Sequence, residues 1–289
     1  MEAINKTTLF QKIKTYKKHP FSAVMYGLVM LAAAITVLSL FFIIIYILAK
    51  GIPYIKPSLF SLTYTSENVS LMPSLINTVT IVITSLIIAI PIGVFSAIYL
   101  VEYAKRGSKL VLAIRLTTET LQGIPSIVFG LFGYLFFVIF LNWRYSLIAG
   151  ALTLSIMILP VIMRTTEEAL LSVPDSYREA SFGIGAGKLR TVFKAVLPSA
   201  LPGIVSGIIL SIGRIVGETA ALIYTSGTMS QVPKSIMGSG STLAIHMYNL
   251  SRENLHVNEA YATAVVLIII VLAINWISSF VAKKIAKGE

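Results

Sequence analysis

Three ionisable side chains lie in or beside long apolar stretches of the sequence, at Arg164, Arg214 and Glu218. A charge at the depth of a bilayer costs about 3 kcal/mol or more, and such residues usually line a pathway or pair with one another. An arginine side chain presents planar, forked donors that match the oxygen atoms of a tetrahedral oxyanion. These three residues are therefore candidates for the lining of an anion pathway.

Each of these residues also has a purely structural explanation. Arg214 and Glu218 are four positions apart, so on one helix they share a face and can form a buried salt bridge that fixes the helix register. Arg164 can extend its side chain to the edge of the membrane. A second pair with the same spacing, Arg115 and Glu119, is predicted to lie at the membrane interface. The face that carries Arg214 also holds the small residues Gly203, Gly207 and Ser211, which allow close approach of a neighbouring helix.

A polar, basic segment at residues 174–198 separates two apolar stretches. A short helix is predicted to begin soon after Pro174 and to be followed by a sharp turn at the glycines of residues 183–187. A second short helix is predicted over Lys188–Val196 and is expected to end at Leu197-Pro198. Two short helices joined by a glycine turn form a compact body that can transmit a push. The plainer alternative is an amphipathic segment on the membrane surface.

The glycines of this segment do not form an ATP site. A phosphate-binding loop has the pattern G-x-x-x-x-G-K-[ST] and follows a strand. In this sequence Phe182 stands where the first glycine is needed, and Leu189 replaces the serine or threonine that holds magnesium. An ATPase, if one is needed, must therefore be another chain.

The sequence also lacks the residues of common hydrolytic active sites. It contains no cysteine, and its three histidines, His19, His246 and His256, lie outside the apolar stretches. The patterns H-E-x-x-H and G-x-S-x-G are absent. We therefore expect neither an enzyme nor a bound metal or cofactor.

The elements that must position these residues are long apolar helices. Only 12% of the residues are charged and 56% are hydrophobic, whereas soluble domains usually carry about a quarter charged residues. Because about 20 apolar residues span a bilayer, we predict an all-α polytopic membrane protein with six transmembrane helices. The third is expected to break at Gly123-Ile124-Pro125. The predicted spans are Phe21–Ala49, Ser74–Leu100, Leu110–Leu141, Ser146–Met163, Ala200–Ile223 and Tyr261–Val281.

The net charge of +11 is distributed unevenly between the two sides of the membrane. Fifteen basic residues lie in alternate connections and the two tails: Lys6, Lys12, Lys14, Lys17, Lys18, Lys105, Arg106, Lys109, Arg178, Lys188, Arg190, Lys194, Lys283, Lys284 and Lys287. Five lie in the other connections: Lys50, Lys56, Arg144, Lys234 and Arg252. Cytoplasmic loops carry the excess of Lys and Arg. Both termini and the polar segment are therefore predicted to be cytoplasmic, and the basic excess indicates topology rather than binding of nucleic acid.

We divide the chain into three parts. Residues 1–69 comprise the cytoplasmic tail, the first span and an external loop, residues 70–282 form the main transmembrane domain, and residues 283–289 form a basic cytoplasmic tail. The longest polar stretch outside the bilayer, Tyr224–Ala260, is predicted to be external. It is either a plain connection or a contact surface for an external protein that delivers substrate.

The polar segment contains the pattern Glu179-Ala180-Ser181-(x)3-Gly185-(x)9-Ala195-Val196-Leu197-Pro198. It resembles the cytoplasmic EAA loop of ABC importer permeases, E-A-A-(x)3-G-(x)9-I-x-L-P, with Ser181 and Ala195 as small departures in size. The resemblance implies docking on a separate ATPase. The residues that match the motif, and to which the resemblance assigns the contact with the ATPase, are Glu179, Ala180, Gly185, Leu197 and Pro198.

Further motifs resemble the PstA-type permeases of phosphate ABC importers. They are Arg164-Thr165-Thr166-Glu167-Glu168-Ala169-Leu170, Gly217-Glu218-Thr219-Ala220, the run from Gly123 to Gly133 and the pair Asn77-Thr78. The family implies a type I ABC importer permease fold, and roles in phosphate passage for Arg164, Arg214 and Glu218. It also implies three partners besides the lipid bilayer: a homologous PstC-type permease, a PstB-type ATPase dimer and an external PstS-type phosphate-binding protein.

The predicted function is that of a permease subunit in the cytoplasmic membrane, coupled by alternating access to a partner ATPase. A permease for another oxyanion, a metal or a sugar is the nearest alternative, since specificity in such importers depends largely on the external binding protein. An ion-driven secondary transporter is the alternative from another class, but it would have no use for an EAA-like loop.

Overall fold

The computed structural model describes residues 20–105, 107–252 and 256–287, and every regular element in these ranges is helical. The chain divides into two compact units, residues 1–50 and 51–289. The segment after Gly51 packs with the second unit, where Leu59 contacts Leu243 and Ala262. The five N-terminal lysines of the charge count and Arg106 lie outside the described residues.

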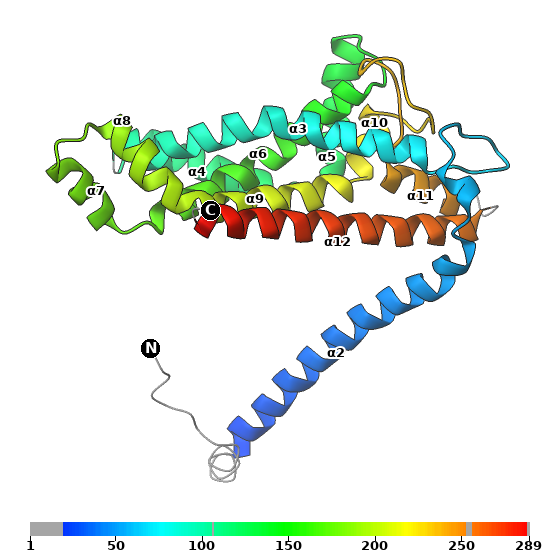
Figure 1. The fold of residues 1–289 in the computed structure, drawn as a ribbon, viewed down its shortest axis with the longest axis horizontal. Helices are drawn as coiled ribbons and strands as arrows, with labels where there is room; N and C mark the ends of the chain where they lie inside the picture. Colours follow the sequence, from blue (N-terminus) through cyan, green and yellow to red (C-terminus); the bar gives the residue numbers. More distant parts are fainter. Residues whose placement is uncertain (1–19, 106, 253–255, 288–289) are drawn as a thin grey trace. The chain divides into compact units, whose positions relative to one another are not determined.

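The first unit is described by one long helix, α2, Pro20–Gly51 (blue in Figure 1). Its only charged residue is Lys50, in the last turn. Apolar side chains surround the helix on all sides instead of forming a stripe. This pattern is typical of a helix surrounded by lipid.

Five helices in the described ranges are long and apolar enough to cross a membrane, and a bent pair forms a sixth candidate span. The bent pair consists of α4 (Lys109–Gln122) and α5 (Ser126–Gly133), the latter continued by the π-helical η4 (Tyr134–Phe140), with an angle of 101° between the two parts. Besides α2, the long helices are α3 (Met72–Ile98, continued by the π-helical η3, Tyr99–Tyr103), α6 (Leu147–Leu171), the continuous run of α8 (Lys188–Thr191), η5 (Val192–Val196) and α9 (Leu197–Val216), and α12 (Val257–Lys287). The predicted break in the third span is thus confirmed.

Helix α6 lies at the centre of the second unit and packs against α3, α9 and both members of the bent pair. Its side chains are buried along most of its length, and Leu154, Ile158 and Ile162 form the core with Ile81 of α3 and Ile215 of α9. The residues near the C-terminal end of α6 are therefore held on a well-packed helix.

Small residues bring α6 and α9 close together. A Cβ atom at Gly207 would collide with Thr165, and one at Gly203 would collide with Ala169. The predicted close approach along this face of α9 is confirmed. It also shows that the two helices run antiparallel, since higher residue numbers on α9 meet lower ones on α6.

The short elements of the second unit gather at two opposite ends of the long helices (Figure 1). One end, called the α7 end below, holds α7 (Asp175–Gly183) and α8. The other, called the α11 end, holds η1 (Ile52–Tyr54), η2 (Pro57–Phe60) and α11 (Leu243–Arg252).

Candidate functional site

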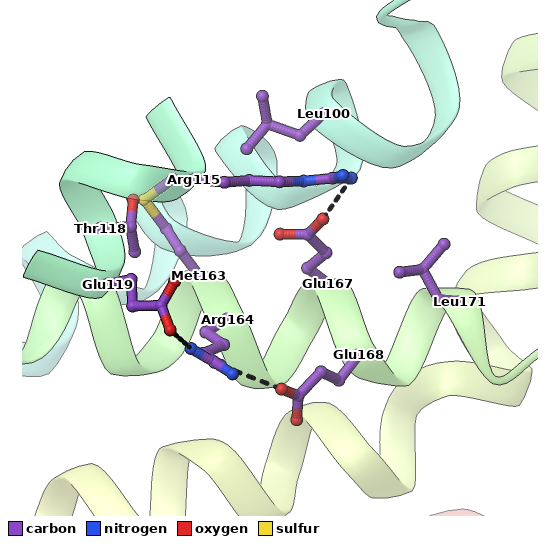
Figure 2. Close-up of a pocket in the computed structure, with 9 residues that line it drawn as sticks. All are labelled: Leu100, Arg115, Thr118, Glu119, Met163, Arg164, Glu167, Glu168 and Leu171. Carbon is purple, nitrogen blue, oxygen red and sulfur yellow. Dashed lines mark hydrogen bonds and ion pairs between the residues drawn. The ribbon is translucent and has the colours of Figure 1, made fainter. Parts of the chain in front are cut away.

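Arg164 lies on α6 toward the α7 end, and its guanidinium group contacts two carboxylates (Figure 2). Its Nε donates to Glu168 Oε1 at 3.1 Å, and its Nη1 lies 3.6 Å from Glu119 Oε1 on α4. The side chain of Arg164 is 48% exposed, and those of Glu119 and Glu168 are 68% and 65% exposed. Exposed pairs of this kind contribute little to stability, so an incoming ion can replace either carboxylate.

A second ion pair lies beside the first. Arg115 Nη2 of α4 is 2.5 Å from Glu167 Oε1 of α6, and the Glu167 side chain is mostly buried. The predicted pairing of Arg115 with Glu119 is therefore wrong. Helix α4 runs antiparallel to α6, because Arg115 meets Glu167 while Gln122 Nε2 donates to the Pro160 carbonyl. Arg115 therefore faces a partner across the interface rather than one turn along its own helix.

These five charged side chains border a pocket of about 240 Å³, whose lining also includes Leu100, Met163 and Leu171 (Figure 2). The lining carries two arginines and three glutamates. Arg115 is held by a partly buried partner, whereas Arg164 is held by exposed ones. The pocket can therefore offer the guanidinium of Arg164 to an anion while the second pair keeps α4 and α6 together.

Arg214 lies in the last turn of α9 and is half-buried. Within the described residues it forms no ion pair and no side-chain hydrogen bond. Because Gly207 meets Thr165, Arg214 lies about two helical turns from Arg164, roughly 10 Å along the helix axes. The two arginines are thus not brought together, but lie at different depths of the same helix pair.

Glu218 does not continue the helix that carries Arg214. Helix α9 ends at Val216, Gly217 follows as its C-terminal cap, and the short helix α10 (Ala220–Thr225) begins after Thr219. Glu218 is buried in this break, and its Oε1 accepts a hydrogen bond from the backbone N–H of Ala221 at 3.1 Å. The expectation that Glu218 lies on span five is wrong, and Gly217 after an apolar run was the sequence signal for a helix end.

The residues expected to couple to an ATPase lie mostly on the surface of the α7 end. Glu179 and Ala180 are exposed on α7, and Gly185 adopts a φ of +83°, which confirms the glycine turn. Ala180 and Gly185 border a groove of about 710 Å³ between α7 and the α8–η5 helix, together with Arg190 and Lys194. This groove can receive a partner of complementary shape.

The second short helix of the segment does not end at Leu197 and Pro198 as predicted. It continues through the π-helical η5 into α9, and the backbone N–H of Leu197 bonds the carbonyl of Val192. A π turn at this place leaves room for the proline ring, which would otherwise clash with the preceding helical turn. Leu197 is partly buried and Pro198 is exposed. An unbroken helix therefore joins the α7 end to α9.

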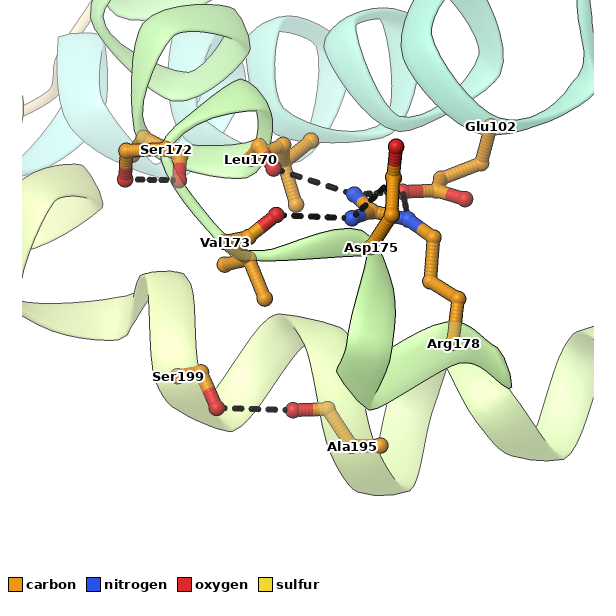
Figure 3. A network of polar contacts seen from close by, with 9 residues as sticks. Glu102, Leu170, Ser172, Val173, Asp175, Arg178, Ala195 and Ser199 are labelled. Atoms are coloured by element: carbon orange, nitrogen blue, oxygen red, sulfur yellow. Dashed lines mark hydrogen bonds and ion pairs between the residues drawn. The ribbon is translucent and has the colours of Figure 1, made fainter. Parts of the chain in front are cut away.

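One residue of this region, Arg178 on α7, was noted in the sequence only for its charge. Its Nε and Nη2 bond Glu102 Oε1 of η3 at 3.1 and 2.7 Å, and Nη1 bonds Asp175 Oδ1 at 3.2 Å (Figure 3). It also donates to the carbonyls of Leu170 and Val173 at 3.0 and 2.8 Å. No local pattern predicted the contact with Glu102, because Glu102 lies 76 residues away in the sequence.

Comparison with known proteins places this arrangement in context. A family model described as "Binding-protein-dependent transport system inner membrane component" matches residues 89–288. The "Probable ABC transporter permease protein YqgI" of Bacillus subtilis is 37% identical over 232 residues, covering 73% of this chain and 78% of that protein. The "Phosphate transport system permease protein PstA" of Haemophilus influenzae is 31% identical over 269 residues, covering 92% of this chain and 95% of that protein.

Among solved structures, a bacterial alginate ABC transporter in complex with an alginate pentasaccharide-bound periplasmic protein contains a similar chain. The TM-score is 0.69 at 14% identity, and the match covers 94% of this chain and 98% of that chain. At this identity the similarity concerns the fold alone. It agrees with the all-α polytopic architecture predicted from the sequence.

Proposed function

Because the chain belongs to the family of binding-protein-dependent transport system inner membrane components, we propose that it is the permease subunit of an ATP-driven phosphate importer. In this proposal it forms half of the translocation pathway and alternates between states that open to the two sides of the membrane. Relatives that are permease subunits of ABC transporters support the permease role. The chemistry of the pocket and the name of one relative support phosphate.

The surroundings of Arg164 are the observation that favours an oxyanion as the substrate. It lies on a membrane-spanning helix, lines a pocket and is held only by exposed carboxylates. Phosphate carries more negative charge than a carboxylate at neutral pH and presents several acceptor oxygens to a forked donor. It can therefore compete with Glu119 or Glu168 for the guanidinium group. The Haemophilus influenzae relative, which matches over nearly its whole length, is named a phosphate transport permease.

Arg214 and Glu218 are proposed as further parts of the same pathway. Arg214 provides a second cation about 10 Å from Arg164 along the helix axes, at the end of α9 where the backbone breaks. Glu218 holds the start of α10 at this break through its bond to Ala221. In the proposal phosphate passes from one guanidinium to the other, and neither binds it so tightly that release becomes slow.

The proposed orientation puts both termini and the α7 end in the cytoplasm, on the strength of the fifteen-to-five excess of basic residues. Three partners complete the importer. A homologous PstC-type permease supplies the other half of the pathway, a PstB-type ATPase dimer docks on the groove of the α7 end, and an external PstS-type protein delivers phosphate at the α11 end.

In the proposed mechanism, ATP binding closes the ATPase pair and moves α7, and the bundle then opens outward to accept phosphate. Hydrolysis returns the bundle to the inward-open state, where phosphate leaves past Arg164. Each state is favoured by a different ligand, as a two-state coupling requires. The continuous α8–η5–α9 helix supports this mechanism, because it joins the docking surface rigidly to the span that carries Arg214.

A permease for another oxyanion is the second candidate. A guanidinium recognises sulfate, molybdate and phosphate by the same forked donors, so the pocket alone supports the class rather than the individual ion. An ion-driven secondary transporter is less well supported, since the exposed groove beside Gly185 would then have no partner.

The test is uptake of radiolabelled phosphate into proteoliposomes that contain this chain, its partner permease and the ATPase, with the binding protein outside. We expect uptake that needs ATP, is not matched by sulfate or molybdate, and is lost when Glu179–Gly185 is replaced by a flexible linker. Transport of a different anion would support the permease role and rule out phosphate as the substrate. Uptake without any need for ATP, in an intact complex, would favour the secondary transporter.

A further inference from the structure

We propose that four side chains at the α7 end form the joint that passes motion of α7 and α8 to helix α3. They are Glu102 and Tyr103 of η3, Arg178 of α7 and Lys188 of α8, and we call them the η3 clasp. The inference rests on the proposed function, in which an ATPase moves the α7 end. It assigns the residues of this chain that carry that movement into the membrane bundle.

Three membrane helices surround the α7 end, and they differ in how they are attached to it. Helix α9 is continuous with α8, and α6 is connected to α7 by the short link at residues 172–174. Helix α3 has no such covalent link, since η3 and α7 are separated by α4, α5 and α6 in the chain. Any motion of α7 must therefore reach α3 through side-chain contacts.

Arg178 provides the strongest of these contacts. Its guanidinium holds Glu102 through two donors and also bonds the Leu170 carbonyl at the end of α6 and the Val173 carbonyl in the link that follows (Figure 3). The side chains of Arg178 and Glu102 are only 16% and 8% exposed. A charge-assisted pair with this many fixed donors sets position and direction together. Arg178 thus ties α3 and α6 to the same point on α7.

A second contact joins α8 to the same turn. Lys188 Nζ lies 5.0 Å from the centre of the Tyr103 ring, within the range of a cation–π interaction. Ser181 and Thr191 are hydrogen-bonded at 2.8 Å, which connects α7 to α8. Adjacent residues of η3 are therefore held by both short helices, and the two short helices are held to one another.

Apolar packing also joins these elements, but it cannot replace the clasp. Ile98 and Val101 lie in one cluster with Val173, Val192 and Val196. Hydrophobic contact is non-directional, so such surfaces can slide while remaining buried. The clasp resists sliding because the donors of Arg178 point at fixed acceptors. The π-helical form of η3 is consistent with this role, since π turns often occur at functional sites.

The first test removes the guanidinium and compares two rates in the same proteoliposomes. In the complete transporter, Arg178→Gln should lower phosphate uptake per ATP hydrolysed by about tenfold, within the usual range of coupling between sites, while ATP hydrolysis changes less than about twofold. The control is Lys109→Gln, which removes an exposed cation at the first residue of α4 and should leave both rates unchanged. A parallel fall of uptake and hydrolysis would show a structural role only, and would overturn the proposal.

Two further variants keep the test decisive if Arg178→Gln assembles poorly. Arg178→Lys retains the charge without the fork, and we expect it to recover part of the lost coupling. Glu102→Gln should lower coupling too, and the double variant Glu102→Gln with Arg178→Gln should be no worse than Arg178→Gln alone, because both changes break one contact. Strictly additive losses would contradict a shared joint.

The second test does not depend on the substrate. The chain has no cysteine, so nitroxide labels at Lys105→Cys and Phe182→Cys, both exposed, report the distance between the end of η3 and α7 in the assembled complex. We expect one narrow distribution in each nucleotide state, and a broad one after Arg178→Gln. If the distribution is unchanged by Arg178→Gln, the clasp is wrong. If the parent complex shows narrow distributions but no phosphate uptake, the choice of phosphate fails and the clasp remains.

Discussion

The two ends of residues 51–289 are held together by different kinds of polar interaction. At the α7 end arginines pair with glutamates: Arg115 with Glu167, Arg164 with Glu119 and Glu168, and Arg178 with Glu102. At the α11 end the buried polar contacts described are hydrogen bonds between uncharged groups. Ser74 bonds Ser241 at 2.9 Å, and Asn77 Nδ2 donates to the carbonyls of Gln231 and Ser241 at 2.9 and 3.1 Å.

This difference indicates which end is built to change. A buried network of neutral hydrogen bonds favours one arrangement, because a lost partner leaves a polar group without a hydrogen bond. Exposed ion pairs can exchange one carboxylate for another, or for a bound anion, at little cost. We therefore expect the α11 end to be the more fixed of the two, while the α7 end combines firm joints, at Arg178 and Arg115, with exchangeable contacts at Arg164.

The largest effect expected on stability comes from the firm joint at Arg178. Arg178→Ala leaves the mostly buried Glu102 without its cation, and should lower the free energy of unfolding by about 3 kcal/mol. Thermal denaturation of the detergent-solubilised chain measures this. The control Arg190→Ala removes an exposed arginine of α8 and should change the midpoint little. Equal shifts in the two variants would mean that the burial of the joint does not matter.

At the fixed α11 end, Asn77→Leu should cost about 2 kcal/mol, since the Gln231 and Ser241 carbonyls lose a buried donor. The matched control is Asn258→Leu in the exposed first turn of α12. The same denaturation measurement applies, and the Asn77→Leu effect should be insensitive to salt. A destabilisation that disappears at high ionic strength would contradict a neutral network.

The α11 end should also respond to acid through His246. Burial lowers the pKa of His246 to about 4, from an ordinary value of 6.5. The unfolded chain binds a proton there between these two pH values and the folded chain does not, so stability is present above pH 6.5 and falls as pH decreases toward 4. Roughly 2 kcal/mol should be lost over this interval. The difference between the parent and His246→Gln denaturation curves isolates this contribution, and a difference independent of pH would be evidence against it.

Replacement of Arg164, whose ion pairs are exchangeable, should affect transport but not stability. If Arg164 lines the pathway as proposed, Arg164→Gln should reduce phosphate uptake by about tenfold, because a forked donor for the anion is lost, while the denaturation midpoint stays within error of the parent. Arg164→Lys tests whether charge alone is sufficient and should recover uptake partly. A normal uptake rate and affinity in Arg164→Gln would show that Arg164 is not part of the pathway.

The smallest expected effect is the salt dependence of the stability that is lost in Arg178→Ala. Raising ionic strength screens exposed pairs more than buried ones. The loss of stability caused by Arg178→Ala should therefore change by only a few tenths of a kcal/mol between about 0.1 and 1 M salt. Measured denaturation midpoints at both salt concentrations decide this. A loss that largely disappears at high salt would place Arg178 among the exchangeable contacts.

Local patterns in the amino-acid sequence were sufficient to predict the long apolar helices, the break at Gly123–Pro125, the turn at Gly185 and the position of Arg164 at the end of an apolar run. These features depend on local composition and on helical periodicity, which report the length of a helix and which residues share its face. A charge within an apolar run is visible for the same reason.

Which charges meet is revealed only by the packing of the helices. Arg115 pairs with Glu167 instead of Glu119, Glu218 caps α10 instead of facing Arg214, and Arg178 reaches Glu102. Periodicity along one helix cannot reveal which helices become neighbours or in what register they pack. Pairing between distant residues depends on that register, and is fixed only when small residues and core side chains bring α3, α4, α6 and α9 together.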